Sequence, residues 1–179
     1  DDLRRLREEG LFEALRNTRA PIAGICGGLQ ILGDRLLDPD GVESSFPEVE
    51  CLGLLPLETV MMLRKTLRRT TALRADGTFI SGYEIHHGAT RCADPSITRI
   101  VDGEGREVGY ERGSIFATYL HGVFDDDVFR RKYLNRLRKH KGWPELETGA
   151  AYGLEDALNR LADHIRARLD IPALYKRMG

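Results

Sequence analysis

The sequence predicts an α/β domain in which helices flank a mixed β-sheet. Strand-like and helix-like patterns alternate near the start, several strand-like patterns follow one another in the middle, and the C-terminal part is helical. A chain of 179 residues that is 41% hydrophobic and 31% charged can bury a core without disulfides or metals. We therefore expect a single domain over residues 1–179.

The first part of the chain predicts a helix, a buried strand and a second helix in close succession. Residues 1–17 place apolar side chains on one helical face, with a break at Gly10. Residues 21–25 form a short apolar run between turn residues, which is typical of a buried parallel strand, and a helix over 27–33 follows directly. Residues 38–50 are polar and contain prolines, so we expect a loop there.

Several strand-like segments follow, separated by turn residues, and two helices close the chain. The expected strands cover residues 53–62, 66–73, 78–85, 97–102, 106–110 and 114–120. A helix capped by aspartates is expected over residues 125–141. Apolar side chains then recur at helical spacing and predict a last helix whose apolar stripe packs into the core, formed by Leu154, Leu158, Leu161, Ile165 and Leu169.

Composition and charge argue against several classes of function. The formal net charge is −1, from 27 basic and 28 acidic residues, which indicates neither a nucleic acid nor an anionic membrane as partner. The basic run over residues 130–141 falls on a predicted helix and is interpreted as a solvated face, with a partner-docking surface as the less favoured alternative. No segment is apolar over the length of a membrane span, and no signal peptide opens the chain. Three cysteines without paired spacing favour reduced thiols and a cytoplasmic protein.

The most informative segment has the form Gly-x-Cys-x-Gly, centred on Cys26, between a strand and a helix. A sharp strand-to-helix turn strains the backbone of a nucleophile, needs small neighbours, and holds the thiol at the carboxyl edge of the sheet. The helix dipole is expected to lower the pKa of the Cys26 thiol, and the Gly27 N–H to bind a developing oxyanion. The alternative is a buried structural cysteine before a glycine-rich phosphate loop. Cys51 and Cys92 lack such a setting and are interpreted as small apolar residues.

A thiol nucleophile needs a base, and His121 is the best candidate among five histidines. His121 ends the apolar strand 114–120 and precedes a glycine, so we expect it at the same sheet edge as Cys26. His86 and His87 end another apolar strand, and either could line the pocket. Because adjacent strand residues point to opposite faces, these two histidines would not chelate one ion, and we predict no metal site.

Three motifs in the sequence resemble a known family. They read Gly24-Ile-Cys-Gly-Gly-Leu-Gln-Ile-Leu-Gly33, Gly82-Tyr-Glu-Ile-His-His-Gly88 and Thr118-Tyr-Leu-His-Gly-Val-Phe124. Together they are similar to the C-terminal glutamine amidotransferase domain of the cobyric acid synthase family, which acts in cobalamin biosynthesis. The resemblance, which extends to about Arg138, implies the class I amidotransferase fold, a flavodoxin-like α/β sandwich. It also implies a C-terminal fragment of a longer synthetase, without the N-terminal strands of the fold and the glycine-containing loop that completes the oxyanion hole.

The resemblance implies a glutaminase site with a Cys–His pair. Cys26 would attack the side-chain amide of glutamine, and His121 would protonate the departing ammonia. Gly27 would donate its N–H to the oxyanion. Gln30 lies one helical turn past Cys26, where it could contact bound glutamine or be an ordinary helix residue. Glu43, in a polar loop, could bind the amino group of the substrate or cap a helix.

The sequence departs from many class I amidotransferases after the catalytic histidine. These enzymes carry a glutamate two residues later, where this chain has Val123. Another acceptor must therefore orient the His121 imidazole. Glu84 is the candidate from its motif, with a backbone carbonyl as the alternative, and a purely structural hydrogen bond is the competing interpretation of Glu84.

The resemblance also places the acceptor chemistry outside this chain. Ammonia would pass to an N-terminal synthetase domain that carries the corrinoid substrate and uses ATP and Mg²⁺, converting adenosylcobyrinic acid a,c-diamide to adenosylcobyric acid. The sequence has no Gly-x-x-x-x-Gly-Lys-[Ser/Thr] loop, and we expect no cofactor in this domain. The alternatives are a related amidotransferase that acts on cobyrinic acid a,c-diamide or cell-wall lipid II, and a non-catalytic docking domain.

Overall fold

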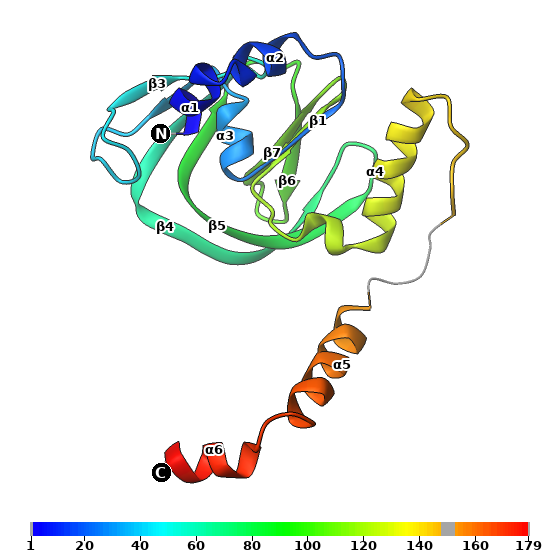
Figure 1. Ribbon diagram of the computed structural model, residues 1–179. Helices are drawn as coiled ribbons and strands as arrows, with labels where there is room; N and C mark the ends of the chain where they lie inside the picture. Colours follow the sequence, from blue (N-terminus) through cyan, green and yellow to red (C-terminus); the bar gives the residue numbers. More distant parts are fainter. Residues whose placement is uncertain (1, 148–152, 179) are drawn as a thin grey trace.

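The computed structural model describes residues 2–147 and 153–178 (Figure 1). The N-terminal elements are α1 (Asp2–Glu8), α2 (Leu11–Asn17), β1 (Ile22–Ile25), α3 (Gly27–Ile31), β2 (Arg35–Leu37) and β3 (Glu48–Glu50). The central strands are β4 (Leu57–Leu73), β5 (Phe79–Cys92), β6 (Thr98–Asp102), β7 (Glu107–Arg112) and β8 (Ile115–Thr118). The remaining elements are a short 3₁₀ helix η1 (Val123–Asp125), α4 (Asp127–His140), α5 (Leu154–Arg166) and α6 (Ile171–Met178).

The strands form one mixed sheet in the order β1-β8-β7-β6-β4-β2-β3, with β5 paired to β4. β1 pairs with β8 and β2 pairs with β4 in parallel, whereas the remaining pairs are antiparallel. The predicted α/β class, a mixed sheet with flanking helices, is therefore confirmed. The parallel β1–β8 pair matters most for function, because the carboxyl ends of parallel strands meet at the same edge.

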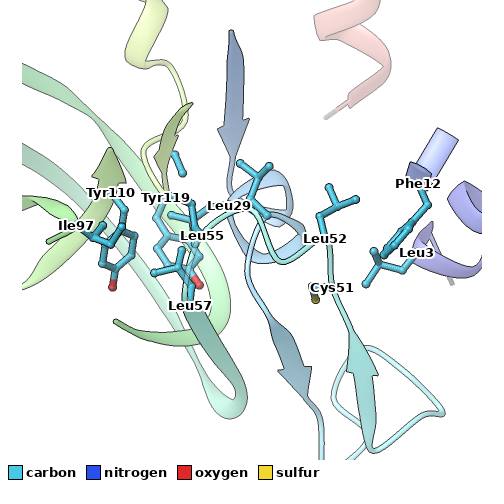
Figure 2. Close-up of a cluster of buried hydrophobic side chains, with 12 residues drawn as sticks. Leu3, Phe12, Leu29, Cys51, Leu52, Leu55, Leu57, Ile97, Tyr110 and Tyr119 are labelled. Carbon is cyan, nitrogen blue, oxygen red and sulfur yellow. The ribbon is translucent and has the colours of Figure 1, made fainter. Parts of the chain in front are cut away.

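Two buried clusters hold the helices against the sheet. The first joins α1, α2 and α3 to the sheet and includes the residues labelled in Figure 2, namely Leu3, Phe12, Leu29, Cys51, Leu52, Leu55, Leu57, Ile97, Tyr110 and Tyr119. The second lies beneath α4 and contains Ala72, Ile80, Ile100, Val108, Phe116, Leu120, Val123 and Phe129. Each fully buried Leu, Ile, Val or Phe side chain in these clusters contributes about 1.5–3 kcal/mol through its removal from water.

The break between α1 and α2 and the start of α4 agree with the prediction, and a single residue determines each of them. Gly10 separates α1 from α2 with a φ of 73°, a left-handed conformation that favours glycine. The Asp126 carboxylate caps α4 by accepting the Phe129 N–H at 2.6 Å, as expected from the aspartates before this helix.

Three strands, β3, β4 and β5, differ from the prediction because pairing with neighbouring strands determines where they begin and end. Segment 38–50, predicted as a loop, ends in β3, a short strand that pairs with β2. β4 is one strand, not two, because it continues through an irregularity between Met61 and Thr66. β5 extends beyond residue 85 to Cys92, since β4 also pairs with residues 88–92.

The C-terminal helices overturn the prediction that their apolar stripe packs into the core. No residue of α5 or α6 is buried, and the stripe residues are 40–54% exposed. The predicted helix is confirmed over α5, which ends at Arg166 before the last stripe residue, Leu169, whereas α6 was not predicted. A periodic pattern shows only which face is apolar and not what covers that face. None of the helices in the described part of the chain combines the length and apolar character of a membrane span.

Candidate active site

Cys26 occupies a strained turn between β1 and α3. Its φ of 54° and ψ of −110° make it the one non-glycine residue with positive φ in the described part of the chain. A Cβ on Gly24 would lie 2.5 Å from Leu32 Cδ1 and 2.9 Å from the Gly28 carbonyl oxygen, so the turn requires glycine two residues before the thiol. This geometry matches a nucleophile elbow, whose strained backbone projects the reactive side chain out of the sheet.

The β1–β8 pairing places the Cys26 turn beside the segment that carries His121. Ile25 lies opposite Thr118, and the Cys26 N–H donates to the Thr118 carbonyl at 2.8 Å. His121 follows three residues after Thr118, beyond the end of β8. The two residues therefore lie at one edge of the sheet, as the sequence predicts.

β5 contacts both Cys26 and His121. The Cys26 Sγ atom is 3.9 Å from the Ile85 carbonyl oxygen, whereas His121 pairs through its backbone with Tyr83. The Tyr83 and Ile85 backbones are about 7 Å apart, because they are two residues apart on a strand. One short stretch of β5 thus lies against the thiol and the imidazole segment.

Tyr83 contacts His121 through both backbone and ring. The His121 N–H donates to the Tyr83 carbonyl at 2.8 Å, and the Tyr83 N–H donates to the His121 carbonyl at 3.1 Å. The two rings stack with centroids 5.2 Å apart and planes 13° from parallel. The His121 Nε2 atom is buried and has no hydrogen-bond partner among the described residues.

Glu84 has a different partner from the one predicted. Its buried carboxylate accepts hydrogen bonds from Arg68 Nε at 2.7 Å and Thr70 Oγ1 at 2.6 Å, and its other oxygen is 3.1 Å from His86 Nε2. Side chains alternate along β5, so Glu84 faces away from the side on which Tyr83 meets His121. The carboxylate therefore holds His86 in the motif, and the prediction that it orients His121 does not agree with its position.

The charged state of Glu84 is strongly favoured. Burial would raise the pKa of Glu84, but hydrogen bonds from His86, Arg68 and Thr70 lower this pKa to about 2. His86 places its second ring nitrogen 2.8 Å from the Gly88 carbonyl and stacks on the Tyr119 ring at 3.7 Å. Hydrogen bonds and ring stacking therefore hold Glu84 and His86 in place on the face of β5 that points away from Tyr83.

The environment of Cys26 opposes the predicted lowering of its pKa. Desolvation by burial raises the pKa of the Cys26 thiol above its ordinary value, and the nearby Glu43 carboxylate raises it further. The Gly27 N–H and the positive charge of Lys65 lower this pKa without offsetting burial. α3 has only 5 residues, so its dipole is small. The thiol is consequently protonated at neutral pH and needs a base.

The two other cysteines pack with the first core cluster, Cys51 inside it and Cys92 against it. Cys51 is buried in the first core cluster, and burial raises the pKa of its thiol to about 11. Cys92 lies at the end of β5, with its Sγ atom 3.5 Å from the Asp94 carbonyl. Both positions agree with their interpretation as small apolar residues.

A pocket of about 500 Å³ opens beside the Cys26 turn. Its wall includes Gly27 and Gln30, and Gln30 donates through Nε2 to the Tyr119 hydroxyl at 3.5 Å. A Cβ on Gly27 would meet no atom within 4 Å, so this backbone is open to a ligand. Glu43 also lines the pocket, which places an anionic group near the thiol.

Asp38 is a structural determinant of this pocket that the sequence did not reveal. Its buried carboxylate accepts the N–H groups of Val42, Glu43 and Ser44 at 2.7–2.9 Å. Burial would raise the pKa of Asp38, but these N–H groups hold it below its ordinary value. The loop that presents Glu43 is therefore fixed from within. An aspartate followed by a turn-forming Gly41 is the only local signal for this role.

His121 faces a second pocket, which Tyr83, Arg69 and the carboxylates of Asp125 and Asp126 also line. Within residues 2–147 and 153–178, no group of three His, Cys, Asp or Glu side chains is placed to hold a metal ion. Cys26, His121 and Gly27 supply a half-buried thiol, an imidazole on a segment at the same edge of the sheet, and a backbone N–H at an open pocket.

A thiol on a nucleophile elbow, with a histidine segment at the same edge of the sheet, is typical of α/β enzymes that act through a cysteine nucleophile. The sequence pattern of the CobB/CobQ-like glutamine amidotransferase domain matches residues 1–129. The chain belongs to this family. It is thus a glutamine amidotransferase domain of the kind found in cobyric acid synthases.

Named relatives and a solved structure agree with this assignment. Cobyric acid synthase from Synechococcus sp. is 43% identical over 186 residues, covering 98% of this chain and 36% of the relative. The Carboxydothermus hydrogenoformans cobyric acid synthase is 38% identical over 192 residues, covering 99% of this chain and 38% of the relative. This chain therefore spans well under half the length of these relatives. A crystal structure of a glutamine amidotransferase matches with a TM-score of 0.53 and 17% identity over 75% of this chain and 71% of that chain, which supports the fold.

The raised pKa of Cys26 predicts a high midpoint for its alkylation. Iodoacetamide reacts with the thiolate, so the rate at Cys26 should rise with pH through a midpoint above that of an unperturbed thiol, about 8.5. Peptide mass spectrometry at each pH measures this rate, with a Cys26→Ser variant giving the background from the other cysteines. A midpoint near neutral pH would show that the thiolate is stabilised and would contradict the dominance of burial.

Proposed function

We propose that this domain hydrolyses glutamine at Cys26 and supplies ammonia for the amidation of corrinoid carboxylates. The observation that carries the proposal is the strained Cys26 turn, held by the β1–β8 pairing at the edge where His121 lies. Relatives that are 36–43% identical over nearly the whole chain are named cobyric acid synthase, which favours a corrinoid acceptor over cell-wall lipid II. A non-catalytic docking domain would have no need for a strained thiol beside an open pocket.

The proposed reaction begins with proton transfer from the Cys26 thiol to His121. The thiolate attacks the side-chain amide carbon of glutamine, and the Gly27 N–H donates to the developing oxyanion. The C–N bond then breaks as His121 returns the proton to the leaving nitrogen, which departs as ammonia. Water hydrolyses the remaining glutamyl thioester to glutamate and regenerates the Cys26 thiol.

The pocket beside the turn is proposed to hold the amino-acid part of the substrate. Gln30 is fixed there by Tyr119, and Glu43 is fixed by the Asp38 loop. The Glu43 carboxylate would pair with the ammonium group of glutamine, which carries the opposite charge. Both residues would therefore bind the substrate without taking part in bond breaking.

The rest of the reaction is proposed for a part of the protein that this chain does not contain. An N-terminal synthetase domain would use ATP and Mg²⁺ to activate carboxylates of adenosylcobyrinic acid a,c-diamide, and ammonia would convert them to amides in adenosylcobyric acid. The share of the relatives that the chain covers, 36–39% for three cobyric acid synthases, leaves room for such a domain.

Replacing the nucleophile separates the two halves of this reaction. In the full-length protein, Cys26→Ser should lower glutamine-dependent corrinoid amidation by roughly 10³-fold or more, because the weaker hydroxyl nucleophile replaces the thiol. Amidation from added ammonium should remain near the unsubstituted rate. Product amides are counted by mass spectrometry, and Cys92→Ser is the matched control. Loss of both activities in the Cys26 variant would indicate a structural role and refute the proposal.

A further inference from the structure

Among the described residues, no carboxylate hydrogen-bonds to the His121 ring, so another group must orient the imidazole. Val123, at the position where many class I amidotransferases have glutamate, is fully buried in the second core cluster. Glu84 faces His86, and the His121 Nε2 atom has no hydrogen-bond partner among the described residues. The imidazole must therefore be fixed by packing and by its own backbone.

Tyr83 supplies both kinds of restraint. It exchanges two backbone hydrogen bonds with His121, and in such an antiparallel pair the two side chains lie on the same face. Their rings are nearly parallel, 5.2 Å apart between centroids. The Tyr83 side chain is 48% exposed, so burial in the core does not explain its position.

The neighbouring glycine permits this close pairing. A Cβ on Gly82 would collide with the His121 carbonyl oxygen, so only glycine lets β5 approach the His121 segment this closely. Gly82 therefore lets the β5 backbone approach the His121 backbone, and Tyr83 supplies the ring that stacks on the imidazole. Two residues farther along, the Ile85 carbonyl lies against the Cys26 thiol, which ties the same strand to the nucleophile.

We propose that Tyr83 is the positioning residue of His121 and replaces the absent glutamate by ring stacking and backbone pairing. This inference rests on the proposed function, because the position of His121 matters only if it transfers the proton. Tyr83 acts through the imidazole and does not touch the amide under attack. Its aromatic ring, not its hydroxyl, restrains the imidazole.

Substitutions at Tyr83 test this role in the full-length protein. Tyr83→Leu should lower kcat for glutamine hydrolysis by about five- to tenfold, in the upper part of the range expected for loss of an aromatic pair, and leave KM within about twofold. Tyr83→Phe should keep kcat within about twofold because the ring remains. Phe79→Leu is the matched control, since Phe79 lies on the same face of β5 and is also exposed. Equal losses in the Leu and Phe variants, or a change in KM alone, would overturn the proposal.

A spectroscopic measurement tests the stacking independently of activity. In histidine-labelled full-length protein, the ring protons of His121 should show an upfield NMR shift from the Tyr83 ring, retained in Tyr83→Phe and lost in Tyr83→Leu. Absence of this shift in the unsubstituted protein would overturn the inference even if the enzyme hydrolyses glutamine. Conversely, a protein with the shift but without glutamine hydrolysis would refute the proposed function.

The C-terminal helices support a second inference from a separate observation. The apolar stripe of α5 and three large apolar side chains of α6, Leu174, Tyr175 and Met178, are at least 40% exposed. An amphipathic helix of this length is only marginally stable without a partner for its apolar face. Neither helix has a buried residue, so the described part of the chain does not cover that face.

The similarity to cobyric acid synthases indicates which partner covers the apolar face of α5 and α6. The family pattern ends at residue 129, before both helices, whereas the cobyric acid synthases match 98–100% of this chain and therefore include them. These synthases are also more than twice as long as the region they share with it, because that region is 36–39% of their length. In these relatives, the segment that matches both helices thus accompanies additional polypeptide and lies beyond the glutaminase pattern.

We infer that α5 and α6 dock their apolar face into an apolar groove on the synthetase part of the same polypeptide. This inference rests on family membership and not on the Cys26 chemistry. The helices would hold the glutaminase body against the synthetase part, so that ammonia need not cross bulk solvent.

Hydrogen exchange of the full-length protein tests this docking. Amides of α5 should be protected, and Leu158→Glu with Ile165→Glu should remove protection from α5 and from one patch of the synthetase part. Arg160→Glu is the control, because Arg160 lies on the opposite helical face and its replacement changes the net charge equally. Unprotected α5 amides in the unsubstituted protein would overturn the inference. So would protection that depends on protein concentration, which indicates a second copy, or a patch that maps to β4 and β5.

Discussion

The parallel pairing of β1 with β8 is the constraint on which the candidate site depends. It sets Ile25 opposite Thr118 and lets the Cys26 N–H donate to the Thr118 carbonyl. Ile25 and Thr118 are almost a hundred residues apart in the sequence, yet their pairing brings a strained turn and a histidine segment to one edge of the sheet. Core packing on both faces of the sheet, under α1–α3 and under α4, keeps this register fixed.

The parts of the site that the sequence predicted have local signals. Gly24 before Cys26 follows from the sharp turn, since a side chain there would meet Leu32 and Gly28. The position of His121 follows from the end of an apolar strand and the geometry of parallel sheets. The α/β class follows from the order of apolar patterns, and the Asp126 cap follows from residue type. Each of these predictions needs only neighbouring residues or a general rule of sheet architecture.

The parts that the sequence could not predict depend on contacts between distant residues. The partner of Glu84 is decided by which face of β5 meets the His121 segment, and no local pattern reports this. The pKa of Cys26 follows the balance between burial and nearby N–H groups, and here burial is the larger effect. The exposed stripe of α5 shows the same limit, because periodicity identifies an apolar face but not its partner.

Covalent labelling by a glutamine analogue tests the central claim, a Cys26 nucleophile in a glutamine site, most directly. The full-length protein is incubated with 6-diazo-5-oxo-norleucine, which alkylates the thiol that attacks bound glutamine, and labelled peptides are identified by mass spectrometry. The account predicts one label per chain, on Cys26, and protection by excess glutamine. Labelling of Cys51 or Cys92 instead of Cys26, or labelling of Cys26 that glutamine does not slow, would contradict it.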